Sequence, residues 1–223
     1  ANYLDYRVIP VLVIDKPSCA KGIGEALLSA GLPVVELTLR TESSWDSYQE
    51  LRKIDGLCLG VGSINSVENM KKTIDLGADF AVSPGLLTEV AEVAIAAGMA
   101  YHPGVATPSE ISRGLSLGLK VLKFFPAEAL GGMKTLNSMS APFKDLRFIR
   151  CQLEVTVNAV IPVILVIDIR SAFFVIQTRI VNFPTARHDL VQCHFTIELI
   201  FRWVFQFHLH NKVGSLCDFG RIN

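Results

Sequence analysis

The sequence has no excess of charge of either sign, because 21 lysine and arginine residues balance 21 aspartate and glutamate residues. A formal charge of zero provides no long-range field that would attract nucleic acid or an anionic membrane surface, so we expect neither as a partner. Charged residues make up 19% of the chain and apolar residues 50%, which excludes the composition of a disordered chain. A length of 223 residues suits one large domain or two small ones.

Cysteine is also scarce, and its five occurrences have no spacing typical of a disulfide framework or a metal site. They are Cys19, Cys58, Cys151, Cys193 and Cys217, an odd number without a CxxC or Cys/His pattern. We therefore predict a reduced, cytoplasmic protein without a metal site. We also expect neither a signal peptide nor a membrane span, because the start of the chain is not basic and no stretch reaches about 18 uncharged residues.

Glycine and lysine nearly disappear after Arg150. Residues 151–223 hold only 2 of the 16 glycines and 1 of the 10 lysines, but 4 of the 5 histidines. Compact α/β domains need glycine and proline at their many turns. We therefore divide the chain into a domain at 1–150 and an unassigned, discordant segment at 151–223. A reading-frame or splice error near Arg150 would explain the change, and a genuine replacement segment is the alternative.

Residues 1–150 alternate short β-branched runs with amphipathic stretches, with a repeat of about 20 to 25 residues that is typical of βα units. The expected strands lie at 8–14, 34–39, 57–61, 80–82, 99–102, 119–124 and 146–149. The expected helices lie at roughly 18–30, 43–54, 66–76, 87–97, 108–116 and 131–140, and the glycines expected to end helices are Gly31, Gly77, Gly98 and Gly118. The pattern predicts a parallel sheet, either doubly wound or closed into a barrel.

The polar face of one expected strand favours the barrel. Glu36, Thr38 and Arg40 alternate with apolar residues and therefore share one face of the strand. A charged face turned inward at the C-terminal end of a strand is typical of a barrel enzyme, whose site lies at that edge. We predict an α/β fold, a (β/α)8 TIM-type barrel whose last one or two βα units are missing or replaced by the atypical tail.

Lys123 stands in an almost entirely apolar stretch at 121–126. Burial would lower the pKa of this amine and create a nucleophile that can form a Schiff base with a ketone. The alternative is a lysine that extends from an edge strand to solvent.

Other candidate site residues lie on the expected strand at 34–39 and just after it. Glu36 could transfer protons, and the guanidinium of Arg40 could bind a carboxylate through two hydrogen bonds. The alternative for these two residues is a structural ion pair. Small polar turns at 60–63, 83–85 and 103–107 would surround the same edge, although each alone is more often only a turn.

Five segments, in order, resemble the family of 2-keto-3-deoxy-6-phosphogluconate and 4-hydroxy-2-oxoglutarate aldolases. They are ELTLRT at 36–41, GVGS at 60–63, GADFAVSPG at 77–85, HPGVAT at 102–107 and KFFPAEALGG at 123–132. The resemblance runs from about residue 8 to 149 and implies a homotrimeric barrel and a class I aldolase (a lyase) of carbohydrate metabolism in the Entner–Doudoroff pathway. Such an enzyme cleaves a 2-keto-4-hydroxy acid into pyruvate and an aldehyde, with no metal and no cofactor beyond its own lysine.

The resemblance also implies roles for single residues. Lys123 is expected to form the Schiff base, Glu36 to shuttle protons and Arg40 to hold the pyruvate carboxylate. The remaining residues expected in the pyruvate pocket are Ser63, where the family usually has threonine, together with Pro84, Gly85, Thr107 and Phe125. His102 falls where the family commonly has an apolar residue, and we expect a histidine of the barrel wall rather than a catalyst.

The resemblance ends after Ile149. The family continues with a Pro-Thr-Gly-Gly-type loop and later a Gly-Gly-Ser turn that bind phosphate, and residues 150–223 contain neither. Because backbone N–H groups of glycine-rich turns form such anion sites, we expect phosphate binding to be impaired and activity reduced or lost. A non-catalytic or truncated paralogue is the alternative function. His208 and His210 lie on an expected strand at 201–210 and are not expected to bind a metal.

Overall fold

The computed structural model describes residues 3–6, 9–150, 155–156, 162–163 and 177–179. A 3-10 turn, η1 (Tyr3–Asp5), comes first. The strands that follow are β1 (Val11–Val13), β2 (Val34–Thr38), β3 (Cys58–Gly62), β4 (Phe80–Ser83), β5 (Tyr101–Val105), β6 (Val121–Phe124), β7 (Arg147–Arg150), β8 (Val155–Thr156), β9 (Pro162–Val163) and β10 (Gln177–Arg179). The helices are α1 (Pro17–Ser29), α2 (Ser44–Arg52), α3 (Val67–Asp75), α4 (Thr88–Ala96), α5 (Pro108–Ser116) and α6 (Gly132–Ser140).

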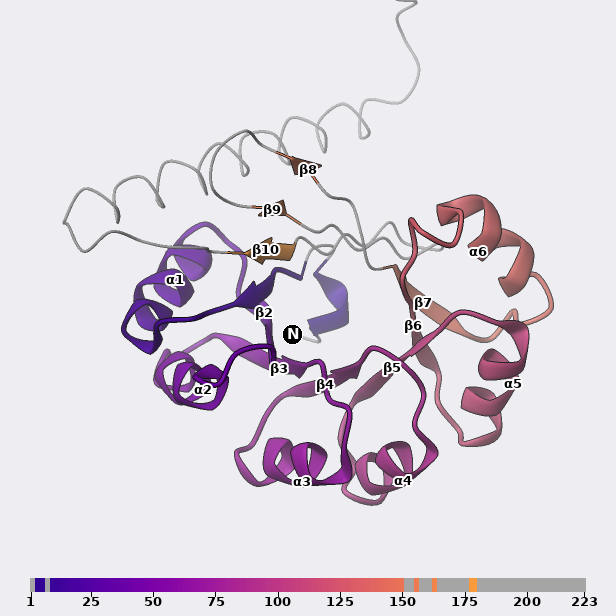
Figure 1. Cartoon of the computed structure of the whole chain (residues 1–223), viewed down its shortest axis with the longest axis horizontal. Coiled ribbons are helices and arrows are strands. Elements are labelled where there is room, and N and C mark those ends of the chain that lie inside the picture. The colour runs from indigo at the N-terminus through magenta and orange to yellow at the C-terminus, as the bar shows by residue number, and fades with distance from the viewer. Residues whose placement is uncertain (1–2, 7–8, 151–154, 157–161, 164–176, 180–223) are drawn as a thin grey trace, which may run out of the picture. The chain divides into compact units, whose positions relative to one another are not determined.

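The main sheet is parallel, and its strands follow the order β10-β1-β2-β3-β4-β5-β6-β7. Figure 1 shows that β1 to β7 form an arc, with α1 to α6 on its outer side and η1 within its curve. Within the described residues, the hydrogen-bonded pairing ends at β7 on one side and at β10 on the other. The predicted parallel sheet with alternating helices is therefore confirmed, as a curved half-barrel.

β10 was not predicted from the sequence, because no strand of this sheet was expected after residue 150. Val11 and Val13 of β1 pair in parallel register with Gln177 and Arg179. A segment of three residues, two of them polar and one charged, carries no recognisable strand pattern. Its place in the sheet depends on the free edge of β1, which only the tertiary structure reveals. The proposed division at residue 150 stays a prediction, and the expected strand at 201–210, with His208 and His210, lies outside the described residues.

β5 is longer than the sequence predicted. The expected strand ended at His102 and a turn followed, but β5 continues through Pro103 and Gly104 to Val105. Proline and glycine are unfavourable within a strand, which explains the error. Gly104 is needed because a Cβ there would lie 2.5 Å from the carbonyl carbon of Pro84, so the loop after β4 crosses closely over this strand.

Two helix starts and four helix ends follow the local chemistry of the sequence. The Ser66 hydroxyl accepts a 3.2 Å hydrogen bond from the Asn69 N–H at the start of α3, and Thr107 and Glu110 form a complete capping box at the start of α5. Gly31, Gly77, Gly98 and Gly118 follow helix ends and take φ values of 78°, 69°, 68° and 83°. All four predicted helix stops are therefore confirmed.

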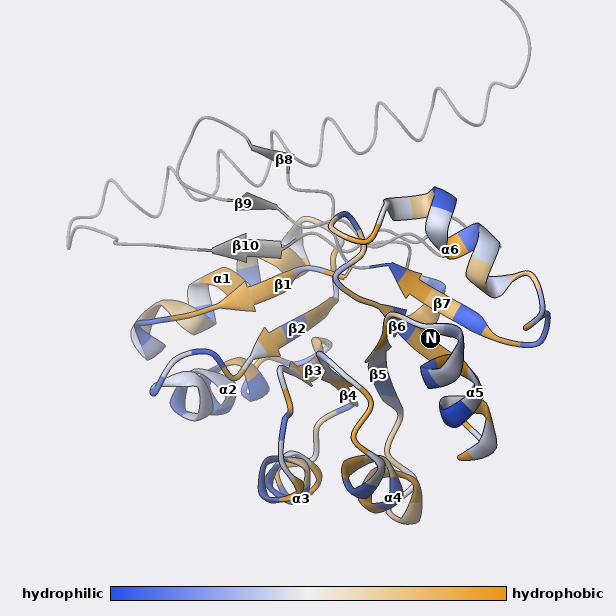
Figure 2. Ribbon diagram, turned by 45° about the vertical axis from the view of Figure 1, so that its right-hand side comes forward, coloured by the Kyte–Doolittle hydropathy of each residue, from blue (hydrophilic) through white to orange (hydrophobic). Residues whose placement is uncertain are grey.

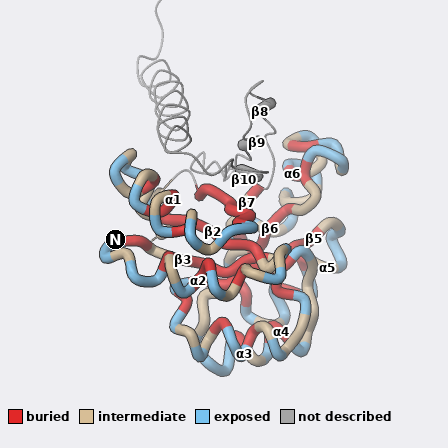
Figure 3. The backbone as a smooth tube through the Cα atoms, turned by 60° about the vertical axis from the view of Figure 1, so that its left-hand side comes forward, coloured by how far each residue is buried: buried red, intermediate tan, exposed pale blue. Residues whose placement is uncertain are grey.

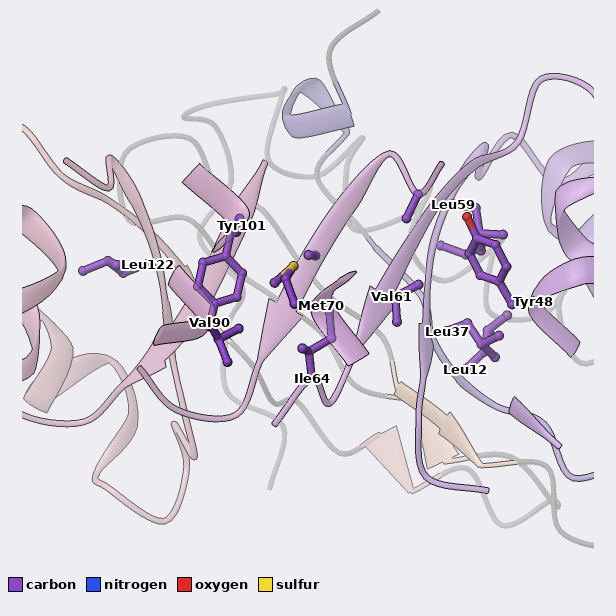
Figure 4. Packing of buried hydrophobic residues seen from close by; sticks show 14 of the residues in the cluster. Leu12, Leu37, Tyr48, Leu59, Val61, Ile64, Met70, Val90, Tyr101 and Leu122 are labelled. Atoms are coloured by element: carbon purple, nitrogen blue, oxygen red, sulfur yellow. The ribbon is translucent and has the colours of Figure 1, made fainter. Parts of the chain in front are cut away.

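Packing between the sheet and the helices forms the larger core. Tyr48 of α2, Met70 of α3 and Val90 of α4 pack toward the outward side chains of the strands, such as Leu37 and Val61 (Figure 4). Hydropathy and burial follow the same division, with apolar, buried strands and helices that are polar and exposed on their outer sides (Figures 2 and 3). No helix in the described part of the chain combines the length and hydropathy of a membrane span.

A smaller apolar cluster fills the inner side of the arc. Its buried members are Ile9, Val11, Val34, Phe80 and Val82, and Tyr3 of η1 packs against them. The Tyr3 and Phe80 rings are stacked, with centres 4.6 Å apart and planes inclined by 11°. The inner face therefore carries an apolar cluster beside its buried polar residues, among them Glu36, His102 and Lys123.

Candidate active site

Lys123 of β6 and Glu36 of β2 meet on the inner face of the curved sheet. Lys123 Nζ lies 3.7 Å from Glu36 Oε1, and the two side chains are only 8% and 5% exposed. The ammonium also lies 5.4 Å from the centre of the Phe125 ring. The alternative of a lysine that extends to solvent is excluded, because Lys123 is buried.

Gly62 creates the space that the Glu36 carboxylate occupies. A Cβ at position 62 would lie 2.7 Å from Cδ and 2.8 Å from Cγ of Glu36, and it would also overlap Oε1. Sequence reasoning placed this glycine in a turn, whereas it is the last residue of β3 and pairs with Thr38. The spacing Gly60-x-Gly62 was a usable signal, because residues two apart in a strand share one face.

Burial makes the Lys123–Glu36 pair suited to proton transfer and nucleophilic attack. A buried charge is costly unless an opposite charge compensates it, and here the two opposite charges lie beside each other. Transfer of one proton from the ammonium to the carboxylate would leave a neutral amine and a neutral acid in the same apolar surroundings. Such a pair can both attack a carbonyl carbon and exchange a proton with the bound molecule.

Arg40 and Ser63 lie side by side beyond the C-terminal ends of β2 and β3. Arg40 Nε donates a 3.3 Å hydrogen bond to Ser63 Oγ, and the arginine is exposed. Ser63 has a φ of 63°, in the left-handed region that non-glycine residues rarely adopt. The structure therefore brings the guanidinium of Arg40, which was expected to hold the pyruvate carboxylate, next to the hydroxyl of Ser63, which was expected in the same pocket.

The other sequence-predicted residues also follow strand ends on the same edge. Pro84 and Gly85 come directly after β4, and Phe125 directly after β6. Thr107 lies two residues after β5, where its hydroxyl donates to Glu110 Oε2 at 2.9 Å and accepts from the Glu110 N–H at 3.3 Å. Because its one hydroxyl proton is already used, Thr107 serves as a helix cap in this structure, and its role toward a ligand stays a prediction.

His102 is a buried histidine of the wall, as expected, and it has two defined partners. Its Nδ1 lies 3.3 Å from the Val121 carbonyl oxygen, and its Nε2 lies 2.5 Å from the Tyr3 hydroxyl. A carbonyl only accepts, so Nδ1 carries the proton and Nε2 accepts from Tyr3. Burial lowers the pKa of His102 to about 4, and the positive charges of Arg147 and Lys123 act in the same direction. Sequence reasoning missed Tyr3, which had no local signal.

Within the described residues, no three His, Cys, Asp or Glu side chains are arranged to hold a metal ion.

The chain is similar to known aldolases over most of its described part. A family model described as "Aldolase: KDPG and KHG aldolase" matches residues 2–155. The 2-dehydro-3-deoxy-phosphogluconate aldolase of Zymomonas mobilis is 40% identical over 141 residues, which are 63% of this chain and 68% of the relative. The range 2–155 that the family model matches includes every sequence-predicted site residue.

The solved structures that resemble this one include two aldolases. The 2-keto-3-deoxy-6-phosphogluconate aldolase of Zymomonas mobilis, crystallised with 3-phosphoglycerate, has a TM-score of 0.64 at 39% identity and covers 65% of this chain and 69% of its own. The KDPG aldolase of Legionella pneumophila, with pyruvate captured as a covalent carbinolamine intermediate, has a TM-score of 0.64 at 33% identity. It covers 66% of this chain and 72% of its own.

Proposed function

Because this chain belongs to the KDPG and KHG aldolase family, we propose that it is a class I aldolase with Lys123 as its Schiff-base lysine. The observation that carries the proposal is the buried pair of Lys123 Nζ and Glu36 Oε1, 3.7 Å apart. The covalent carbinolamine with pyruvate in the Legionella pneumophila relative supports the same chemistry here. The substrate class is 2-keto-4-hydroxy acids.

The reaction follows from the two side chains. The neutral amine of Lys123 attacks the C2 carbonyl carbon and forms a carbinolamine. Its hydroxyl leaves as water with the proton that Glu36 took from the lysine, which restores the Glu36 carboxylate and leaves an iminium ion. Glu36 removes the proton of the C4 hydroxyl, directly or through a water molecule, and the C3–C4 bond breaks as an aldehyde forms at C4. The electron pair of that bond moves into the iminium and produces an enamine. Protonation at C3 and hydrolysis then release pyruvate and regenerate the amine.

Substrate binding is assigned to the residues at the strand ends. The guanidinium of Arg40 matches the geometry of a carboxylate, and the adjacent Ser63 hydroxyl can donate to the same group. Phe125 lies under the lysine and supplies an apolar surface. We retain Pro84, Gly85 and Thr107 as further parts of the pyruvate pocket. We also retain a (β/α)8 TIM-type barrel whose last one or two βα units are missing or replaced, a homotrimeric assembly and a cytoplasmic location.

Borohydride trapping tests the proposal directly. The whole chain is incubated with pyruvate, reduced, digested and analysed by mass spectrometry. We expect one reduced pyruvate adduct, on Lys123, and none in Lys123→Arg, because a guanidinium does not form a Schiff base under these conditions. Lys120→Arg is the matched control, because Lys120 lies on the same segment but is exposed, and it should be trapped like the parent chain.

Two results would contradict the proposal. Folded protein that gives no adduct at Lys123 would point to the non-catalytic paralogue. Full trapping in Lys123→Arg would place the nucleophile elsewhere.

We propose further that the enzyme prefers small, unphosphorylated keto acids. The support is the composition of 151–223, whose only glycines are Gly214 and Gly220, because glycine-rich turns supply the N–H groups that bind phosphate. Each lost charge-assisted hydrogen bond weakens binding by roughly 1.5–3 kcal/mol. The measurement is kcat/KM for 4-hydroxy-2-oxoglutarate and for 2-keto-3-deoxy-6-phosphogluconate with one preparation. A strong preference for the phosphorylated substrate would show that another phosphate site exists.

A further inference from the structure

We propose that His102, held by Tyr3, is a positioning residue for Lys123: its side chain replaces a backbone donor that β5 lacks and thereby secures β6. The inference rests on the proposed function in one respect, that Lys123 is the Schiff-base lysine. It concerns residues that neither the catalytic pair nor the pyruvate pocket includes. His102 and Tyr3 lie farther toward the N-terminal ends of the strands.

The missing donor follows from the register of β5 and β6. Gly104 pairs with Lys123 and Val105 with Phe124, and the Phe125 N–H donates to the Val105 carbonyl. In a parallel ladder, alternate residues of one strand bond to the same neighbour, so residue 103 also faces β6. An N–H at 103 would donate to the carbonyl of Val121. Pro103 has no N–H, so this ladder bond cannot form.

The pairing on the far side of β6 supports this assignment. The Arg147 N–H of β7 donates to the carbonyl of Lys120, at 2.9 Å. Because successive carbonyls of a strand point to opposite sides, the next one, Val121, points toward β5. The His102 Nδ1–H reaches that carbonyl at 3.3 Å and so takes the place of the missing backbone donor.

Tyr3 completes the arrangement from the other side of the imidazole. Its hydroxyl donates to His102 Nε2, and this bond leaves the ring proton on Nδ1, where Val121 needs it. The stacking of Tyr3 on Phe80 of β4 holds the phenol ring in place. The tyrosine hydroxyl thus reinforces the tautomer that the contact with the Val121 carbonyl requires.

The His102 contact can affect catalysis because Val121, which it binds, and Lys123 are close together on β6. Val121 lies two residues before Lys123 on the same strand, and their side chains share the inner face. β6 pairs with β5 at Lys123 and Phe124, and the His102 contact adds a bond between the two strands before these pairs. The charged or titratable groups that act on His102 and Tyr3 are Cys58 of β3, Lys123 of β6 and Arg147 of β7.

Three substitutions separate the positioning role from simple packing. His102→Leu keeps an apolar wall but removes the donor, whereas His102→Asn keeps a donor at the place of Nδ1. Val82→Ala is the matched control, because Val82 lies beside His102 in the register and is equally buried, but has no polar contact with β6. The readouts are the rate of pyruvate trapping against pyruvate concentration and amide hydrogen exchange of residues 119–125, with folding checked by circular dichroism.

We expect His102→Leu to lower the maximal trapping rate about tenfold, because misplaced reacting groups cost rate, with an unchanged half-saturating pyruvate concentration. Exchange at 119–125 should accelerate in this variant. His102→Asn should restore both readouts to within about threefold of the parent chain, and Val82→Ala should change neither.

The outcomes distinguish this inference from the proposed function. If the parent chain is not trapped, the proposed function is wrong, and hydrogen exchange still decides whether His102 secures β6. If the parent chain is trapped and His102→Leu matches it in rate and in exchange, the positioning role is wrong. Equal losses in His102→Leu and His102→Asn would show that the Val121 contact does not matter.

Discussion

At the scale of single residues, the inner face of β3 carries glycines where other strands carry side chains. Gly60 and Gly62 face the interior without side chains, and the space is filled by the Phe80 ring and by the Glu36 carboxylate, respectively. A strand interior usually disfavours glycine, because it contributes no packing. Here the missing Cβ atoms allow larger side chains from the neighbouring strands to approach. Gly62 is thus needed for the position of Glu36, because any side chain at position 62 would displace the carboxylate.

Gly62→Ala should abolish activity while the protein still folds. The new methyl group would overlap the Glu36 carboxylate and force it away from Lys123. We expect overpacking to cost about 1–3 kcal/mol of stability. We expect kcat to fall by about 10² or more, since proton transfer needs the carboxylate in place.

The assays for this variant are steady-state cleavage and denaturant unfolding. Gly24→Ala is a suitable control, because its methyl group would press on Ile54 and Leu51 in the outer layer, far from the site. It should affect stability but leave kcat unchanged. Normal turnover in Gly62→Ala would mean that the position of Glu36 is not critical.

Glu36→Gln should separate Schiff-base formation from cleavage. The amide keeps the shape of the side chain but cannot accept the proton of the C4 hydroxyl. We expect pyruvate to be trapped at Lys123, while kcat for cleavage falls by about 10²–10⁴. The measurement compares the trapped fraction with steady-state turnover in one preparation. A loss of turnover below about tenfold would assign Glu36 a structural role.

At the scale of elements, the turn between β5 and α5 directs three donors at one carboxylate oxygen. The N–H groups of Ala106 and Thr107 and the Thr107 hydroxyl all donate to Glu110 Oε2, at 2.8, 2.9 and 2.9 Å. This exceeds the two reciprocal bonds of an ordinary capping box. The turn is therefore held by Glu110, and through it the edge of the site beside Gly104 keeps its shape.

Glu110→Ala should destabilise the protein by about 1 kcal/mol, in the range of lost helix caps, and lower Tm by about 2–4 °C. We expect less than about a twofold change in the pyruvate concentration that gives half-maximal trapping. Calorimetry and trapping measure the two effects. Glu92→Ala, at an exposed position on α4, should leave both unchanged. Much tighter pyruvate binding in Glu110→Ala would reveal that the freed Thr107 hydroxyl binds the ligand.

At the scale of the whole molecule, a buried neutral histidine makes folding depend on pH. His102 has a pKa of about 4 when folded, because burial disfavours the charged form, against an ordinary value of 6.5. Between these two values the unfolded chain binds a proton that the folded chain does not. The contribution of His102 to the free energy of unfolding is thus fully present above about pH 6.5 and is lost as the pH falls toward 4.

The difference between pKa values of 6.5 and about 4 corresponds to about 3 kcal/mol. We predict that the free energy of unfolding falls more steeply from pH 7 to pH 4.5 in the parent chain than in His102→Asn, by about 2–3 kcal/mol in total. Urea unfolding at several pH values measures both slopes, and other titrating groups cancel in the comparison. Parallel slopes would show that His102 is accessible to protons in the folded chain.

Much of the site could be predicted from the sequence because its signals are local or part of a resemblance. Lys123 stands out by its apolar neighbours, and Glu36 and Arg40 by their alternation along one strand. The contacts among them could not be predicted from local patterns, since they depend on the curvature of the sheet. Gly62 was assigned to a turn and Tyr3 was missed, because each matters through a residue far away in the chain.

The sequence by itself determined the alternation of strands and helices, the helix stops and the candidate site residues, because these follow from periodicity, backbone preference and residue type. Only the tertiary structure decided that β5 continues through Pro103 and Gly104, and that His102 supplies the bond that Pro103 cannot. It also decided which side chains meet within the curve of the sheet. Burial, register and the close approach of strands are properties of the assembled fold, and no local stretch of sequence contains them.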